Sequence, residues 1–282
     1  MSQAIAVCHG EFGRAALYRL DKTIITHAHR EGHLVFYVDG DVAQVTCGST
    51  TCKVNEKSAA AVSPWEPHNF DIKPNCEMIC LVLYIKPMWF LENSVSAENA
   101  LKFGRPDLRL TPEMLQYVNR LTTLLLENEE QENFDQLLFS LTKESYNLSW
   151  ADTKSDCKMR AYTRFSDFRV RRSLRLIQEK IGEDMDLEME KLARCVGLSR
   201  PHFFKLFKQS MGVTPNVYMN TLRSERAIED LLHTEKTVTD IAFDLGFSSQ
   251  ASFTRFFSSN VGIAPSEYRR VAHVTDGAFP MM

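Results

Sequence analysis

Four histidines in the N-terminal half have the residue type and spacing to form a ligand or metal site. His27 and His29 are two residues apart in a strand-like run, so both imidazoles project from the same face. His33 follows shortly after, and His68 ends the segment PWEPH, which also contains Trp65. Imidazole nitrogens bind zinc-like ions and also hydrogen-bond to carboxylates and hydroxyls. We therefore expect either an effector pocket lined by the four histidines, with Trp65 as a wall, or a divalent metal site formed by the histidines.

A second set of candidate residues lies near the C-terminus, in a segment that occurs twice. The first copy, KLARCVGLSRPHFFKLFKQSMGVTPNVY, spans residues 191–218, and the second, DIAFDLGFSSQASFTRFFSSNVGIAPSEY, spans residues 240–268. Each copy has a short amphipathic helix pattern, a glycine that permits a tight turn, a serine N-cap and a second helix pattern. This is the pattern of a helix-turn-helix unit, and its repetition predicts two such units.

The second helix of each unit separates a buried side from an outer side. Phe203, Leu206 and Phe207 recur at the i, i+3, i+4 spacing of a core-facing stripe, and residues 253, 256 and 257 repeat it with phenylalanines. The remaining side chains form the predicted recognition faces: Pro201, Phe204, Lys205 and Lys208 in the first unit, and Gln250, Ala251, Ser252, Thr254 and Arg255 in the second.

The segment between the two copies is predicted to be one continuous helix. Residues 216–233 carry apolar positions at helical spacing and follow Pro215, which suits the first turn of a helix. At 1.5 Å per residue this helix spans roughly 27 Å, close to the ~34 Å between successive major-groove faces on one side of B-DNA. The spacing therefore indicates two DNA-reading units on one rigid spacer.

Residues 169–270 resemble the DNA-binding domain of the AraC/XylS family of bacterial transcription regulators. The resemblance is carried by ARCVGLSRPHFFKLF, RSERAIEDLL, TVTDIAFDLGFSSQASFTRFF and GIAPSEYRR. It implies contacts with promoter DNA from Arg200 together with the two recognition faces, and RNA polymerase as a further partner. Phe204 departs from the polar base-reading residue that such regulators often carry, so it suits a thymine methyl group or DNA shape instead.

The N-terminal half is predicted to be a small β-barrel or jelly roll. Short β-branched and aromatic runs indicate strands at residues 23–27, 34–38, 42–47, 59–62, 68–72 and 78–85, with a hairpin signal at Asp39-Gly40. HAHREGHLVFYVDG with PWEPHNF resembles the two motifs of the cupin barrel, which implies that His68 faces His27 or His29 across the interior. His33 stands where enzymatic cupins usually have glutamate, which argues against catalysis.

Two helices, at residues 111–128 and 132–148, are predicted to follow the strands as an antiparallel hairpin. They either cover the barrel or, as the family resemblance implies, form a homodimer contact through apolar residues such as Leu125 and Leu138. Residues 151–168 have the polar, aperiodic composition of a linker. The expected fold is α+β with two domains: a cupin-like barrel with a helical hairpin (1–150), and an all-α double helix-turn-helix after the linker (169–282).

Charge and composition are consistent with this organisation. The net charge is −3, but residues 169–270 hold 16 Lys and Arg against 13 Asp and Glu, whereas residues 1–168 hold 17 against 22. The positive half is the predicted DNA-binding half. The seven cysteines form no regular framework, and no signal segment or long apolar run is present, so we expect a cytoplasmic protein that does not enter membranes.

The sequence thus favours a non-enzymatic transcription activator that responds to a small-molecule effector bound in its N-terminal barrel. Two alternatives stay open. One is a metal-dependent cupin enzyme fused to a DNA-binding domain, and the other is a constitutive DNA-binding protein whose barrel only dimerises. Stoichiometric metal would favour the first alternative, and effector-dependent DNA affinity would favour the regulator.

Overall fold

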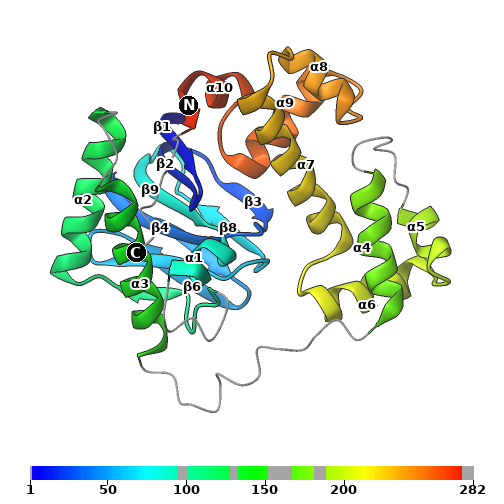
Figure 1. Ribbon diagram of the computed structural model, residues 1–282, viewed down its shortest axis with the longest axis horizontal. Coiled ribbons are helices and arrows are strands. Elements are labelled where there is room, and N and C mark those ends of the chain that lie inside the picture. The colour runs from blue at the N-terminus through cyan, green and yellow to red at the C-terminus, as the bar shows by residue number, and fades with distance from the viewer. Residues whose placement is uncertain (1, 94–100, 128–132, 152–166, 181–188, 275–282) are drawn as a thin grey trace.

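The computed structural model describes residues 2–93, 101–127, 133–151, 167–180 and 189–274. A strand-rich N-terminal region and a helical C-terminal region lie side by side, as the α+β expectation required (Figure 1). The strands are β1 (Gln3–Gly10), β2 (Gly13–Leu20), β3 (Ile24–His27), β4 (Gly32–Gly40), β5 (Ala43–Cys47), β6 (Thr50–Val54), β7 (Ser58–Val62), β8 (His68–Asp71), β9 (Met78–Ile85), β10 (Asp107–Arg109) and β11 (Ala272–Val274). The helices are α1 (Pro87–Asn93), α2 (Pro112–Glu127), α3 (Phe134–Trp150), α4 (Phe168–Lys180), α5 (Met189–Cys195), α6 (Arg200–Met211), α7 (Pro215–His233), α8 (Val238–Asp244), α9 (Gln250–Val261) and α10 (Pro265–Val271).

The strands form two sheets that pack face to face. The larger has the order β10-β7-β4-β9-β2-β1-β11, and the smaller has the order β3-β8-β5-β6. Tyr18 and Val82 of the larger sheet share one core with Val45 and Phe70 of the smaller sheet. Among the described strands no ladder joins the two sheets, so the closed cupin-like barrel is not observed. The edge strand β3 packs instead against α7 and α9 of the C-terminal region.

The hairpin predicted at Asp39-Gly40 is wrong. β4 pairs with β7 and β9 in the larger sheet, whereas β5 pairs with β6 and β8 in the smaller one. Gly40 has a φ of 89°, and the amide of Asp41 donates to the carbonyl of Glu77. The glycine therefore turns the chain from one sheet to the other. An Asp-Gly pair indicates a turn with positive φ, but it does not show whether that turn joins two paired strands or two different sheets.

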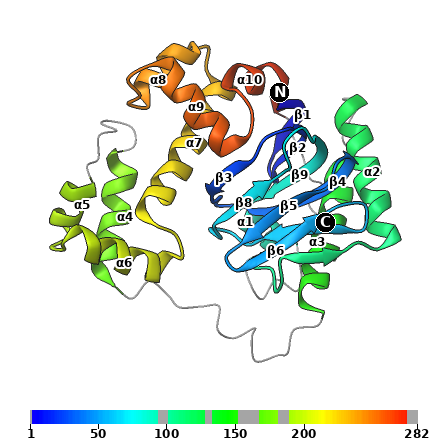
Figure 2. The same ribbon diagram turned by 180° about the vertical axis from the view of Figure 1, so that it is seen from behind.

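The helical hairpin covers the outer face of the larger sheet (Figure 2). α2 and α3 contact each other and place an apolar stripe on β1, β2, β4 and β10. Leu125 and Leu138 are 5% and 0% exposed within this core. These two side chains are therefore occupied by the sheet of their own chain and are not available to a dimer seam. Homodimer formation itself stays a prediction.

The C-terminal region is joined to the sheets by more than the linker. Most of the linker, residues 152–166, lies outside the described residues, as do residues 275–282 of the predicted last domain. At its end β11 pairs in parallel with β1, with Val7 opposite Ala272 and His9 opposite Val274. Phe253 and Tyr268 belong to the same apolar core as Tyr18, so one hydrophobic core runs from the sheets into the last helices.

Candidate functional site

The first predicted helix-turn-helix unit is formed by α5 and α6. Gly197 has a φ of 73° between the two helices, a conformation that glycine adopts without steric cost. Ser199 precedes α6, and Pro201 occupies its first turn. Phe203 and Phe207 are fully buried, with their ring centroids 5.6 Å apart. The buried stripe therefore turns the opposite side of α6 to solvent.

The second unit repeats this geometry with α8 and α9. The side chain of Thr237 caps α8 by accepting from the amide of Asp240, whose carboxylate accepts from the amide of Thr237 in return. Gly246 has a φ of 74°, and the hydroxyl of Ser249 accepts from the amide of Ser252 at 3.1 Å. The two caps fix where α8 and α9 begin, and the cap at Ser249 thereby determines which side chains of α9 face outward.

The predicted recognition residues lie on the solvent side of α6 and α9. Among these residues Phe204, Ser252 and Thr254 are half-buried, and the following are exposed: Arg200, Pro201, Lys205, Lys208, Gln250, Ala251 and Arg255. The guanidinium carbon of Arg200 lies 4.9 Å from the centroid of the Phe204 ring, which orients the arginine beside the aromatic face. The face on α6 thus presents three cations beside Pro201 and Phe204, whereas the face on α9 presents Arg255 beside small polar groups.

One straight element separates the two units. α7 has 19 residues, which at 1.5 Å per residue is roughly 28 Å, and it confirms the helix predicted at residues 216–233. The hydroxyl of Thr214 caps its start by accepting from the amide of Val217. Figure 1 shows α7 running from the first unit to the second, along the flank of the sheets.

A cavity of about 590 Å³ lies between α7 and the sheets. Its walls come from β1, β2, the segment after β3, α7, the end of α9 and β11. Arg14, Lys86 and His9 contribute cationic or polar groups on the sheet side, and Glu225 contributes a carboxyl on the α7 side. A space of this size suits a small organic ligand, with cationic groups on one side and a carboxyl group on the other to orient it.

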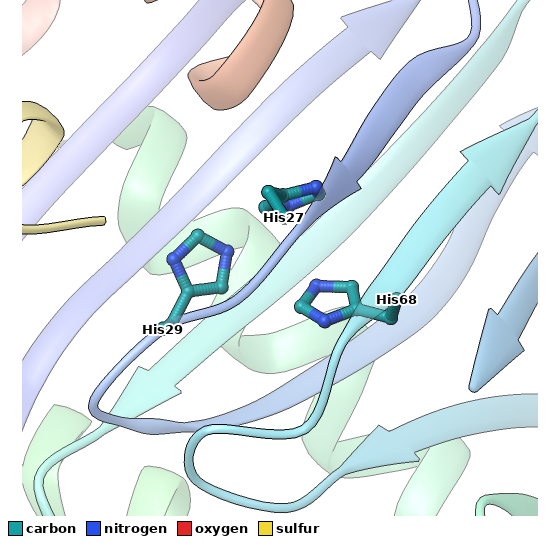
Figure 3. Close-up of side chains that lie close together, drawn as sticks. All are labelled: His27, His29 and His68. Carbon is teal, nitrogen blue, oxygen red and sulfur yellow. The ribbon is translucent and has the colours of Figure 1, made fainter. Parts of the chain in front are cut away.

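The histidine cluster opens into this cavity. His27 and His29 line it, and His68 lies behind them on β8, so the rings converge from two segments (Figure 3). Ring centroids are 4.3 Å apart for His27 and His68, and 4.8 Å apart for His27 and His29. One ligand nitrogen from each of the three lies within 4.8 Å of the others. Three of the four histidines predicted to form one site therefore converge.

His33 has a different position from the other three. Its Nδ1 lies 2.9 Å from Nε2 of His68, and its ring stacks on Tyr84 with centroids 4.6 Å apart. It is therefore a neighbour of His68 and not one of the three residues that can share an ion. Neither His33 nor His68 lines the cavity.

Burial keeps the cluster uncharged near neutral pH. Desolvation lowers the pKa of His27 to about 4, with the charge of Arg14 acting in the same direction. Desolvation, followed by the repulsion of the neighbouring histidines, also holds the pKa of His29 and His68 well below the usual value. Neutral imidazoles retain one lone pair each, which is the form that binds metal ions and accepts hydrogen bonds.

Trp65 does not form a cavity wall. Its indole stacks on Tyr218 of α7, with ring centroids 4.8 Å apart and planes 22° apart. Its backbone amide donates to the carbonyl of His29, and its φ of 62° is unusual for a large residue. Trp65 therefore ties the first unit to the histidine segment, a function that its position between two prolines did not indicate.

The structure also adds functional candidates that the sequence did not single out. Arg14 is buried, with its guanidinium carbon 3.6 Å from the centroid of the Tyr84 ring, and it donates to the hydroxyl of Tyr268 at 3.0 Å. Desolvation raises the pKa of Glu225 to about 8, although Arg30 lies 2.8 Å from its carboxylate and opposes the shift. These groups come from strands and helices far apart in sequence, and no spacing rule links them.

Comparison with known proteins identifies the C-terminal region. A family model described as a helix-turn-helix domain matches residues 192–271. That range covers both units and the helix between them. The region is an AraC-type helix-turn-helix domain. Among curated relatives, an HTH-type transcriptional regulator of Staphylococcus aureus is 44% identical over 84 residues, and the lactose operon transcription activator of Staphylococcus xylosus is 32% identical over 83.

These matches cover the AraC-type domain and little else. They span 30% and 29% of this chain, and the chain spans 11% of the length of the first relative and 30% of the second. A wider likeness exists in fold. ToxT from Vibrio cholerae, solved with a bound unsaturated fatty acid, superposes with a TM-score of 0.54 over 91% of this chain and 94% of its own, at 17% identity. Among the helices that the structure describes, none has the length and apolar content to cross a membrane.

Proposed function

We propose that this chain is a sequence-specific regulator of transcription whose DNA affinity is controlled by a small molecule bound in the cavity between α7 and the sheets. The observation that carries the proposal is the position of α7. One face of this helix lines the cavity through Thr221, Ser224 and Glu225, and its two ends hold the two helix-turn-helix units. A ligand that contacts α7 therefore bears on the spacing and orientation of both recognition faces.

The proposal differs from the sequence-based expectation in where the effector binds. A barrel interior was expected, whereas the space between the sheets is filled by Tyr18, Val45 and Phe70. The cavity lies outside that core, next to the AraC-type domain. Activation through RNA polymerase is carried over from the resemblance, and a promoter–reporter assay tests it directly.

DNA recognition is tested by substituting one cation on each face. Lys205→Ala and Arg255→Ala are expected to weaken binding to a duplex selected from a random-sequence pool by about 1 to 3 kcal/mol if they contact bases. A lysine that contacts only phosphate would weaken selected and scrambled duplexes alike. Fluorescence anisotropy titration at fixed salt measures both.

Lys143→Ala is the matched control, because Lys143 is an exposed lysine on α3, away from both units. It should leave affinity within error of the parent chain. Unchanged affinity in both Lys205→Ala and Arg255→Ala would overturn the assignment of the two recognition faces.

Effector control is tested on the same chain with a metabolite collection. A ligand of the folded state raises the midpoint of thermal unfolding, and an effector must in addition change the affinity for DNA. A ligand that stabilises the protein without changing DNA affinity would contradict control through α7.

A further inference from the structure

Alternate residues of the segment from His27 to Arg30 make two different sets of contacts. His27 and His29 point to the histidine cluster, whereas the two residues in the other register contact α7. The carbonyl of Ala28 accepts a hydrogen bond from the hydroxyl of Thr221 at 2.9 Å, and Arg30 forms an ion pair with Glu225 at 2.8 Å. Because residues 28 and 30 are covalent neighbours of His27 and His29 in the segment that follows β3, whatever holds the two imidazoles in place also restrains the contacts with α7.

The hydrogen bonds of the cluster leave lone pairs directed away from the backbone. Nδ1 of His27 lies 2.7 Å from the carbonyl of Ile25, and Nδ1 of His68 lies 2.9 Å from the carbonyl of Glu66. A carbonyl only accepts, so each Nδ1 is the protonated nitrogen and each Nε2 carries a lone pair. This is the arrangement of metal-binding histidines, whose second nitrogen is held by a backbone carbonyl or a carboxylate.

Two further buried nitrogens lack a hydrogen-bond partner among the described residues. They are Nε2 of His29 and Nε2 of His33. Leaving a buried polar atom unsatisfied is costly, and each such atom in a folded protein calls for an explanation. For His29, whose ring lies between those of His27 and His33, a shared ion supplies that explanation.

We propose that His27, His29 and His68 bind a divalent transition metal ion of the kind that prefers imidazole, zinc being the representative, and that the ion fixes the docking of α7. Zn–N bonds of about 2.0 to 2.1 Å in a tetrahedral site place ligand nitrogens about 3.3 Å apart. The ligand atoms already lie within 4.8 Å of one another, so they need to approach by at most about 1.5 Å to reach this spacing.

A hydrogen bond between His33 and His68 competes with binding of the ion. The lone pair on Nε2 of His68 accepts from Nδ1 of His33, and the ion takes this lone pair for itself. His33, whose ring stacks on Tyr84, loses this acceptor when the ion binds. The fourth coordination position of the ion faces the cavity, where water or an anionic group of an effector completes the tetrahedron.

The metal site is tested by titrating the full chain, stripped of metal by a chelator, with cobalt chloride and zinc chloride. We expect one equivalent of either ion per chain and a visible cobalt absorption typical of tetrahedral nitrogen ligands. His29→Ala should weaken binding at least tenfold, and it is expected to fold because Nε2 of this side chain makes no hydrogen bond among the described residues. His202→Ala, which removes an exposed imidazole on α6, should bind cobalt as the parent does.

Coupling to α7 has a readout that involves neither DNA nor an effector. Hydrogen exchange at residues 217–229 should slow when zinc is added to the parent chain and stay unchanged when zinc is added to His29→Ala. Absence of stoichiometric metal in the parent chain, or full metal binding by His29→Ala, overturns the site. Metal binding with no change in exchange along α7 overturns the coupling alone. The proposed function is tested separately by the DNA titrations.

Discussion

The hydroxyl of Tyr268 links the end of the AraC-type domain to the larger sheet, and its removal should loosen that junction. Tyr268 is fully buried on α10, where it accepts from Arg14 at 3.0 Å and lies 2.8 Å from Nε2 of His9. Burial, followed by the charge of Arg14, lowers the pKa of His9 to about 3, so this imidazole is neutral and its Nε2 accepts the tyrosine proton.

Tyr268→Phe keeps the ring and its packing against Phe257 but deletes both hydrogen bonds. A hydrogen bond to a charged donor contributes about 1.5 to 3 kcal/mol, and a neutral one about 0.5 to 1.5 kcal/mol. The variant should therefore lose about 2 to 4 kcal/mol of unfolding free energy, because Arg14 is also left buried with one partner fewer. Urea denaturation followed by far-ultraviolet circular dichroism measures the change.

Tyr37→Phe is the matched control. Its hydroxyl donates to the carbonyl of Gly40 at 2.9 Å, but this hydrogen bond is exposed to water, so its loss should change stability by less than about 1 kcal/mol. If Tyr268→Phe is no more destabilising than Tyr37→Phe, the junction does not depend on the buried hydroxyl and the argument is refuted.

Two other predictions concern the cavity carboxyl and the turn between the sheets. Burial raises the pKa of Glu225 to about 8 despite Arg30, so the folded chain holds this proton more tightly than the unfolded chain, and the associated stability is present below pH 4.5 and lost as the pH rises to 8. Glu225→Gln should gain stability relative to the parent across that window, by at most about 1.4 kcal/mol per pH unit, and parallel pH–stability curves would contradict this. Gly40→Ala should lower the unfolding free energy by more than Gly48→Ala in urea denaturation. A Cβ at Gly40 would lie 2.4 Å from the carbonyl oxygen of Glu77, whereas one at Gly48 meets nothing within 4 Å. Equal losses of unfolding free energy would show that positive φ alone is responsible.

The sequence predicted best where local rules determine the structure. Gly197, the Ser249 cap and the phenylalanine stripes were predicted correctly, because turn and cap chemistry acts within a few residues. The expected cap at Ser199 is wrong in one respect, since its side chain makes no capping hydrogen bond. β1 and β2 were not predicted. Most residues of β2 are buried, since helices cover one side of the sheet and the smaller sheet covers the other, so the period-2 alternation that identifies strands is missing.

The candidate site was predicted only in part, for a different physical reason. His27 and His29 share a short segment, and period 2 places them together. Arg14 and Glu225 meet across a cavity that exists only because α7 docks on the sheets, and Trp65 stacks on Tyr218 through the same docking. Contacts between regions more than 150 residues apart in sequence depend on tertiary packing, which residue spacing does not encode.

The pairing of β11 with β1 makes the two DNA-reading units mechanically unequal. The second unit is anchored on both sides, by the strand that follows α10 and by the close approach of Gly262 to Ile24. The first unit is held to the sheets through Trp65, Ala28 and the length of α7. On DNA the second unit would therefore keep its position relative to the sheets, and the first unit would be the one that moves. Under the proposed function, a ligand bound in the cavity would mainly change the distance between the two units. That change would select among DNA half-site spacings and leave the bases read by the second unit unaltered.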